Sequence, residues 1–349
     1  MYANDFAIKN GKLKVDFLYV PNRKGSDAFL AGCDGEYFLL DGGNDNTIAL
    51  EKLIEIRADL LSSYKGNDTD SIKLKLNLII SHFHVDHVTA LYKYIIPNKY
   101  IEIDNVYLGV TSVLGKSDYF DSAKNGDITF RVWVLEALQK YQPTAKLNYI
   151  DFREKKTVYG KNKNLRLDFY GSTEDWGEGD INDITKGIGY IKHYYYGHRT
   201  EEDTRFFLSI ATVNANCMWC KMTFINRAFL FVGDIFKKIV PELIGEPMDK
   251  FLEFYGYDEF KCDVLKYTHH GHHREAAKFI TTEYMKPEHV VFTIDPATSA
   301  PDMDKAGINW YNTAFEPFFF TTDGEKLEVS VKPHHYEYNE NGEIIPKKD

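Results

Sequence analysis

Alternating apolar and polar positions predict strands along much of the chain. Between Ile72 and Ile80 every second residue is apolar, and the residues between them include Lys73, Lys75 and Asn77. This period of two is typical of a strand with one face in the core. The same pattern, bounded by turn-forming residues, predicts strands at 13–20, 27–31, 36–40, 105–110, 164–170, 206–213, 217–225, 228–232, 262–267, 290–294, 316–321 and 327–332.

Apolar residues at helical spacing predict helices between some of these strands. Leu50, Leu53 and Ile54 recur at intervals of three and four residues after Asn46-Thr47, a plausible helix start. Helices are predicted over 47–62, 87–96 and 127–141, and Pro97 ends the second of them. Strands that alternate with helices favour an α/β fold.

Composition adds no sign of a second domain. Of the 349 residues, 44% are hydrophobic and 15% aromatic, which suffices for a well-packed core. We see no repeat, low-complexity segment or Pro/Ser-rich linker, so we expect one domain over 1–349, with an insertion at about 171–204 that is rich in Gly, Asp and Tyr. The formal net charge of −10 makes the average surface repel polyanions, which argues against sequence-reading DNA binding.

The four cysteines do not form a disulfide framework in a chain of this length, which favours a reducing compartment. Cys217 and Cys220 are expected on opposite faces of a strand, so they make a poor redox or zinc pair. The first twelve residues lack the apolar stretch of a signal peptide, and no apolar run approaches the roughly 20 residues that span a bilayer. We therefore expect a cytoplasmic protein without a membrane partner.

The strand that ends at Ile80 leads directly into a cluster of metal-binding residue types. His82, His84, Asp86 and His87 place four such side chains within six residues, on the turn between a strand and a helix. Imidazole and carboxylate ligands suit zinc, manganese or iron. A solvated polar loop would account for one histidine but not for this density, so the sequence predicts a metal site.

Two later strands end in the same way. Phe229–Val232 is followed by Gly233-Asp234, and the strand from Val264 is followed by His269-His270-Gly271. Alone, Asp234 would be read as a turn residue or a helix cap. Because three strands end in such polar residues, Asp234 gains a more specific role: its carboxylate could bridge two metal ions.

Taken in order, Asp41-Gly42-Gly43, the 82–87 cluster, Gly233-Asp234 and His269-His270-Gly271 resemble the metallo-β-lactamase superfamily. Within it, the chain is most similar to the hydrolase domain of the ComEC/Rec2 competence proteins. That likeness rests on Gly25-Ser26-Asp27-Ala28, on Leu265-Lys266 before the histidine pair, and on Thr322-Asp323-Gly324. The match spans about 13–332 and is weak between the motifs, notably over 98–205. It implies an αββα sandwich with a dinuclear site at one edge of its two sheets.

The resemblance also implies a set of ligands for two divalent ions, Zn²⁺ or Mn²⁺. His82 and His84 would hold the first ion, Asp234 would bridge, and the second ion would be held by Asp86, His87 and one histidine of the 269–270 pair. We favour His269 as that ligand, because it comes earlier after the strand, and His270 as a donor to the substrate or leaving group. Asp86 or Asp234 would orient the activated water, and Asp41 would brace the ligand loop.

The chain departs from the superfamily at the third histidine of the first metal. Where that ligand is expected, the sequence reads Asp168-Phe169-Tyr170-Gly171-Ser172. His193 or His198 could fill the gap from the insertion, or the first site is incomplete, which we favour. Lys266, His272 and His273 either face the site or lie in solvent.

These features predict a hydrolase that uses a metal-activated water, with phosphodiesters as the expected substrates, either nucleic acid or a small phosphodiester. The basic residues between Arg153 and Arg166 could follow a phosphate backbone, or form a solvated hairpin face. Tyr194-Tyr195-Tyr196 could stack a base, or be local core. Alternatives are a lactone, thioester or β-lactam hydrolase of the same superfamily, and a metal-stabilised binding module without catalysis. DNA uptake itself is not implied.

Overall fold

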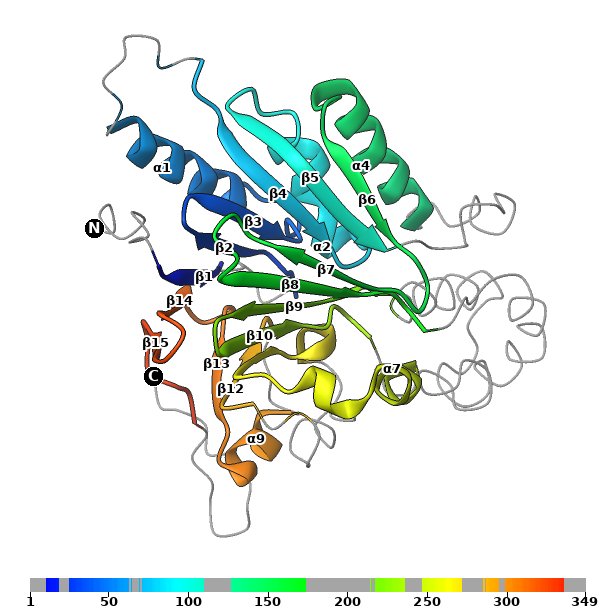
Figure 1. Ribbon diagram of the computed structural model, residues 1–349, viewed down its shortest axis with the longest axis vertical. Coiled ribbons are helices and arrows are strands. Elements are labelled where there is room, and N and C mark those ends of the chain that lie inside the picture. Colours follow the sequence, from blue (N-terminus) through cyan, green and yellow to red (C-terminus); the bar gives the residue numbers. More distant parts are fainter. Residues whose placement is uncertain are drawn as a thin grey trace, which may run out of the picture.

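Two β-sheets lie face to face at the centre of the computed structural model, with helices on their outer sides (Figure 1). The structure describes residues 11–18, 25–62, 64, 69, 71–109, 127–173, 214, 217–235, 247–271, 285, 287–294 and 299–335. Sheet A has the order β15-β14-β1-β2-β3-β4-β5-β6, and sheet B has the order β13-β12-β11-β10-β9-β8-β7. The strands of sheet A are β1 (Leu13–Phe17), β2 (Phe29–Cys33), β3 (Glu36–Leu40), β4 (Leu74–Ile80), β5 (Ile101–Gly109), β6 (Lys146–Ile150), β14 (Phe318–Thr322) and β15 (Leu327–Val329). Those of sheet B are β7 (Lys155–Tyr159), β8 (Leu165–Tyr170), β9 (Trp219–Phe224), β10 (Arg227–Phe231), β11 (Val264–Lys266), β12 (His289–Phe292) and β13 (Asn309–Asn312).

Three apolar layers hold the sheets and helices together. One lies between sheet A and the helices α1, α2, η2 and α4, a second lies between the two sheets, and a third lies between sheet B and α7, η4 and α9. The helical segments are α1 (Ile48–Ser62), α2 (Val85–Ala90), the π-helix η2 (Leu91–Ile95), α4 (Asp127–Tyr141), α7 (Pro247–Tyr255), η4 (Tyr257–Phe260), η5 (Thr268–Gly271) and α9 (Ala300–Ala306). The order of layers is helix, sheet, sheet, helix, which confirms the predicted αββα sandwich.

The pleat of β4 connects the sequence pattern to these layers. Leu76, Leu78 and Ile80 pack against the helices of sheet A, whereas Ile79 points into the layer between the sheets. The predicted alternation was therefore correct at Lys73 and Lys75, which are exposed, whereas the other face becomes buried further along, at Asn77 and Ile79.

Parallel pairing determines where the strand ends meet. The strands β3, β4, β5 and β6 run parallel in sheet A, and β10, β11, β12 and β13 run parallel in sheet B. The chain that leaves β4 lies against the start of β9, where the Met218 amide donates to the Ser81 carbonyl at 2.9 Å. The polar segments after β3, β4, β10, β11 and β12 thereby gather at one edge of the sandwich.

Most predicted elements occur near their expected places. The strand 36–40 and the helix 127–141 have the predicted bounds, while the helix expected at 87–96 begins at Val85 and becomes a π-helix at Leu91. The strands β6, β7 and β13 and the helices α7 and α9 were not predicted. Residues of β6 and β7 are mostly exposed or half-buried, so these edge strands lack the apolar face that the prediction required.

Several sequence predictions concern residues outside the described part of the chain. They are the strand at 206–213, the insertion at 171–204 beyond Thr173, and the tyrosine run 194–196. In the described part, Cys217 packs outside sheet B and Cys220 packs between the sheets, so the two do face opposite sides as expected. No helix within the described residues combines the length and apolarity that crossing a bilayer requires.

The basic stretch between Arg153 and Arg166 lies on and beside the β7–β8 hairpin. Lys155 Nζ lies 2.6 Å from a carboxylate oxygen of Glu259, and Arg166 Nε lies 2.8 Å from one of Asp168. These pairs partly neutralise the stretch.

Asp16, a buried carboxylate in β1, provides a stability prediction. Although Lys14 Nζ lies 3.5 Å away, burial outweighs this pairing and raises the pKa of Asp16 to about 6. A carboxyl group whose pKa is raised in the folded state contributes most to stability below its unfolded-state pKa of about 4. This contribution is lost as the pH rises through the pKa of the folded state. We expect Asp16→Asn to reduce the fall in unfolding free energy between pH 4 and pH 8 by roughly 2–3 kcal/mol. Urea denaturation at both pH values measures it, and parallel pH profiles of the two proteins would contradict it.

Candidate metal centre

The segment from Ser81 to His87, which joins β4 to the first turn of α2, carries four of the predicted ligands and is fixed by its neighbours. The amides of Gly42 and Gly43 donate to the His87 carbonyl at 2.6 and 3.1 Å. Asp41 accepts hydrogen bonds from the Ser81 amide at 2.8 Å and from the Ser81 hydroxyl at 2.6 Å. Asp41 therefore braces the loop, in the place where the sequence predicted a bracing residue.

Asp234, at the end of β10, lies at the centre of the histidines. Its Oδ2 is 3.3 Å from Nε2 of both His87 and His270, 3.8 Å from Nε2 of His82, and 3.9 Å from Nε2 of His269. The donor atoms form two groups that share Asp234. One group contains His82 and His84, and the other contains Asp27, His87 and His270; within each group the ligand atoms lie within 4.8 Å of one another.

Two further contacts tighten these groups. His82 Nε2 lies 3.0 Å from His84 Nδ1, and His270 Nε2 lies 3.0 Å from Asp86 Oδ2. Asp86 thereby joins the second group. All four residues predicted within the 82–87 cluster therefore lie in the donor groups around Asp234.

The spacing of these donors fits metal ions. Ligand atoms about 2.0–2.1 Å from a tetrahedral ion lie roughly 3.3 Å apart. The pairs above lie between 3.0 and 3.9 Å apart. His87 is completely buried and its Nε2 makes no hydrogen bond, although Asp234 Oδ2 is only 3.3 Å away. A buried nitrogen and carboxylate that face each other without a hydrogen bond suit a shared cation, and the residues present fit a pair of divalent ions.

Two buried carboxylates orient the two inner histidines. Asp41 Oδ2 lies 2.8 Å from His87 Nδ1, and Asp27 Oδ1 lies 3.0 Å from His270 Nδ1. When each carboxylate accepts the Nδ1 proton, both rings present a bare Nε2 toward Asp234. Such carboxylate–histidine pairs fix the tautomer and the direction of metal-binding rings.

The structure places the 269–270 pair differently from the prediction. His270, which was expected to be the substrate donor, lies buried among Asp27, Asp86 and Asp234. The side chain of His269, which was expected to be the ligand, is 22% exposed and farther from Asp234. The physical reason is the backbone after β11, where both histidines have positive φ, 45° and 61°. This left-handed turn directs the second ring, rather than the first, toward the centre.

Asp27 is a site residue that the sequence analysis did not identify. It precedes β2, is completely buried, and its Oδ2 forms an ion pair with Lys266 Nζ. The available signal was the Gly25-Ser26-Asp27-Ala28 segment. Gly25 is needed there because a Cβ at this position would lie 2.6 Å from the His270 ring.

The third ligand of the first group remains a prediction, because His193, His198, His272 and His273 lie outside the described residues. Within the described part, Asn214 and Cys217 lie between the segment 168–172, where that ligand was expected, and Gly233-Asp234. Cys217 Sγ lies 3.3 Å from the Asp234 amide nitrogen. Asn214 is completely buried, and neither polar atom of its side chain has a hydrogen-bond partner.

Burial and neighbouring charges shift the pKa values of the centre's residues in different directions. Burial alone would lower the pKa of His87, but Asp234 and Asp41 raise it well above its ordinary value. Burial alone would raise the pKa of Asp86, but His87 and His270 lower it to about 2. His82 differs, because burial and the neighbouring histidines lower its pKa. Ionised carboxylates close to a neutral imidazole favour binding of a cation.

Gly233 allows the turn that presents Asp234. Its φ is +57°, and a Cβ would lie 3.0 Å from Cys217 Sγ and 3.3 Å from Ser81 Cβ. Gly35 also has positive φ but nothing within 4 Å of such a Cβ, so it is a matched control. Both Gly→Ala variants are expected to lose about 1–2 kcal/mol to the left-handed backbone. Gly233→Ala should lose about 1–3 kcal/mol more from crowding. Urea denaturation measures both, and equal losses would contradict the crowding.

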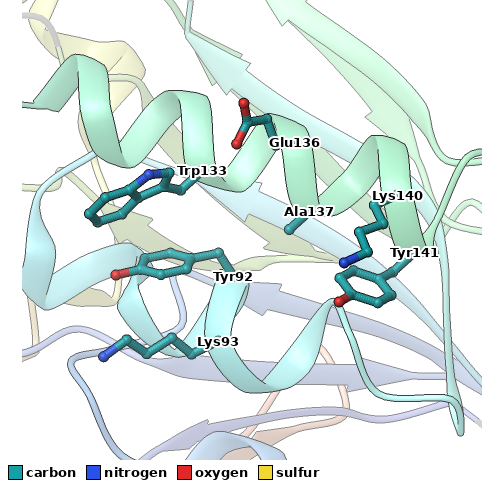
Figure 2. Close-up of a pocket in the computed structure, with 7 residues that line it drawn as sticks. All are labelled: Tyr92, Lys93, Trp133, Glu136, Ala137, Lys140 and Tyr141. Atoms are coloured by element: carbon teal, nitrogen blue, oxygen red, sulfur yellow. The ribbon is translucent and has the colours of Figure 1, made fainter.

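A separate hollow of about 530 Å³ opens between η2 and α4 (Figure 2). It is lined by Tyr92, Lys93, Trp133, Glu136, Ala137, Lys140 and Tyr141. The Tyr92 and Trp133 rings lie one above the other with centroids 5.4 Å apart, and Lys140 lies beside Tyr141. None of the metal-centre residues lines this hollow.

No protein-family profile matches the chain, and no curated protein matches it. Solved structures with a similar course of the chain include the metallo-β-lactamase-fold protein YhfI of Bacillus subtilis, with 12% identity, a TM-score of 0.37, and coverage of 81% of this chain and 85% of that one. The short form of human tRNase Z has 12% identity, a TM-score of 0.33 and coverage of 72% and 76%. Zinc-bound PqqB of Methylobacterium extorquens has 12% identity, a TM-score of 0.33 and coverage of 85% and 77%. The αββα architecture itself rests on the chain's own strand order and layers.

Proposed function

We propose that the chain is a metal-dependent hydrolase that cleaves phosphodiesters. The observation that carries the proposal is the position of Asp234, whose Oδ2 lies within 3.9 Å of four imidazole nitrogens from two strand ends. A single buried carboxylate oxygen shared by two groups of donors is the arrangement needed to hold two ions close together. When bound, such ions supply Lewis-acid activation of water and stabilise charge that develops at the attacked atom.

The chain's own residues have distinct parts in this proposal. His82 and His84 would hold one ion, Asp86, His87 and His270 would hold the other, and Asp234 would serve both. Asp86 is the more exposed carboxylate, with 25% of its side chain accessible, so it can orient the attacking water. His269 is partly exposed at the same edge, and it is the histidine placed to donate a proton to the leaving oxygen.

The phosphodiester class rests on the similarity to ComEC/Rec2 hydrolase domains. Two of the segments that carry this similarity, Gly25–Ala28 and Leu265–Lys266, contribute Asp27 and Lys266 to the centre. The third, Thr322–Gly324, instead forms a turn where Gly324 packs closely against Ile225. Residues that the superfamily's general motifs do not require are therefore part of the site, which favours the ComEC/Rec2-like assignment over another branch.

A substrate panel tests the proposal. The purified chain, supplied with Mn²⁺ or Zn²⁺, is assayed on bis-p-nitrophenyl phosphate, an aryl ester, a lactone, a thioester and a chromogenic β-lactam. We expect metal-dependent turnover of the phosphodiester that exceeds turnover of the other substrates. Ester, lactone, thioester or β-lactam turnover without phosphodiester turnover would overturn the proposed class and favour another hydrolase of the same type.

One observation favours a second candidate, a metal-stabilised binding module. Within the described residues, the first group offers His82, His84 and Asp234 but no third histidine. An ion held by so few ligands would be weakly retained. Metal binding without turnover of any substrate in the panel would support this candidate, and any turnover that His84→Ala abolishes in a folded protein would exclude it.

A further inference from the structure

Lys266, the last residue of β11, is a buried charge directly beneath the metal centre. It is only 1% exposed, and like Val264 it points into the space between the two sheets. Its Nζ forms an ion pair with Asp27 Oδ2, lies 3.5 Å from Asp234 Oδ1, and donates to the Gly233 carbonyl at 3.4 Å. A lysine this deeply buried requires specific partners, because desolvation of its ammonium group is costly.

The two carboxylate oxygens of Asp234 have different surroundings, and Lys266 accounts for the difference. Oδ2 faces the imidazole nitrogens of His82, His87 and His270, whereas Oδ1 has no hydrogen bond and faces the ammonium group. If the carboxylate plane turned so that neither oxygen faced Lys266, Asp234 would lose this attraction, while the ammonium group would keep its contacts with Asp27 and Gly233. Asp234 is therefore held so that one oxygen serves both groups of donors.

The same ammonium group also acts on His270 through Asp27. Asp27 Oδ2 pairs with Lys266, while Asp27 Oδ1 lies 3.0 Å from His270 Nδ1 and accepts from the Thr293 hydroxyl at 2.8 Å. Because Asp27 already has these partners, it acts behind the histidines rather than as a metal ligand itself. One ion pair thus aligns a ligand from the end of β10 and another from the end of β11.

We propose that Lys266 is a positioning residue for the metal centre, which holds the Asp234 carboxylate with one oxygen facing both groups of donors and, through Asp27, orients His270. This inference rests on the proposed function, since it assigns a role toward the ions that the site would hold. A purely structural role is the rival explanation. In that case Lys266 would serve only to neutralise the buried charge of Asp27.

The test uses three variants and readouts that need no turnover. Lys266→Met removes the ammonium group at nearly constant length, Asp27→Asn removes its partner's charge, and the double variant removes both. Affinity for Zn²⁺ is measured by competition with a chromogenic chelator, and coordination geometry by the visible spectrum of the Co²⁺-loaded protein. Lys221→Met is the matched control, because Lys221 is also largely buried but donates to the Glu259 carbonyl, apart from the metal centre.

We expect Lys266→Met to weaken the binding of at least one ion by about 10–100-fold, as is typical when a partner of a metal ligand is lost, and to alter the Co²⁺ spectrum. The double variant should stay equally weak, since Asp234 has still lost its partner. The double variant also provides a test if Lys266→Met alone does not fold. With asparagine at position 27, it contains no buried carboxylate that has lost its lysine partner there. Lys221→Met should bind like the original protein.

Two results would overturn the inference. One is a Lys266→Met protein with the original affinity and spectrum. The other is a double variant that regains both, which would show that Lys266 only balances Asp27. If the original chain binds two ions but hydrolyses nothing, the proposed function fails while this inference is still judged by the variants. A chain that binds no metal overturns both.

Discussion

Replacement of Asp234 by alanine is expected to remove metal from both groups of donors and to lower phosphodiester turnover by more than 100-fold. Asp234 Oδ2 is the atom that the two groups share, lying 3.8 Å from His82 and 3.3 Å from both His87 and His270. Loss of a residue that merely orients a ligand typically costs about 10–100-fold, so loss of the shared ligand should cost more. Metal content is measured by elemental analysis, and turnover with bis-p-nitrophenyl phosphate.

Asp258→Ala is the matched control for this experiment. Asp258 lies in η4, before the start of β11, with 90% of its side chain exposed, and it pairs with Lys261. It should retain full metal content and turnover. If folded Asp234→Ala protein kept the metal content of the original chain, Asp234 would not be the shared ligand.

Removal of metal with a chelator is expected to lower the melting temperature by roughly 5–15 °C. Ions that bind only the folded chain stabilise it by about 4 kcal/mol each when present at 1,000 times their dissociation constant. At about 2.1 cal/mol/K per residue, the unfolding entropy of 349 residues is about 0.7 kcal/mol/K, so 1 kcal/mol corresponds to roughly 1.4 °C. In the metal-free centre, the buried carboxylates Asp27 and Asp234 share the ammonium group of Lys266.

Differential scanning calorimetry with and without chelator measures this shift. The Asp234→Ala protein provides the control, since its melting temperature should not respond to the chelator. An unchanged melting curve for the original chain, after elemental analysis has verified that the metal is gone, would contradict a metal-stabilised fold.

The sequence predicted the architecture and the ligand loop because both depend on local patterns. The alternation from Ile72 to Ile80 identifies β4. The four metal-binding residues that follow this strand must therefore lie at the edge of the sheet. Gly233-Asp234 follows β10 in the same way. Since the polar segments that follow parallel strands meet at the same edge of a sheet, these motifs could be brought together before any coordinates were known.

Residues whose direction depends on tertiary contacts could not be assigned in this way. Asp27 precedes a strand that runs antiparallel to β1 and β3, so its arrival at the same edge depends on the complete strand order. The order of His269 and His270 depends on left-handed φ values, which few residues other than glycine adopt and which a sequence pattern does not locate. Lys266 shares a face of β11 with the buried Val264, a pattern that indicates a buried charge, but its partners come from the segments after β10 and before β2.

The most direct test of the account is the metal content of the purified original chain, loaded with Zn²⁺ or Mn²⁺ and then freed of loosely bound ions. The arrangement of His82, His84, Asp86, His87 and His270 around Asp234 predicts about two ions per chain. A single retained ion would contradict the dinuclear centre. A folded chain that retains none would contradict the metal centre itself.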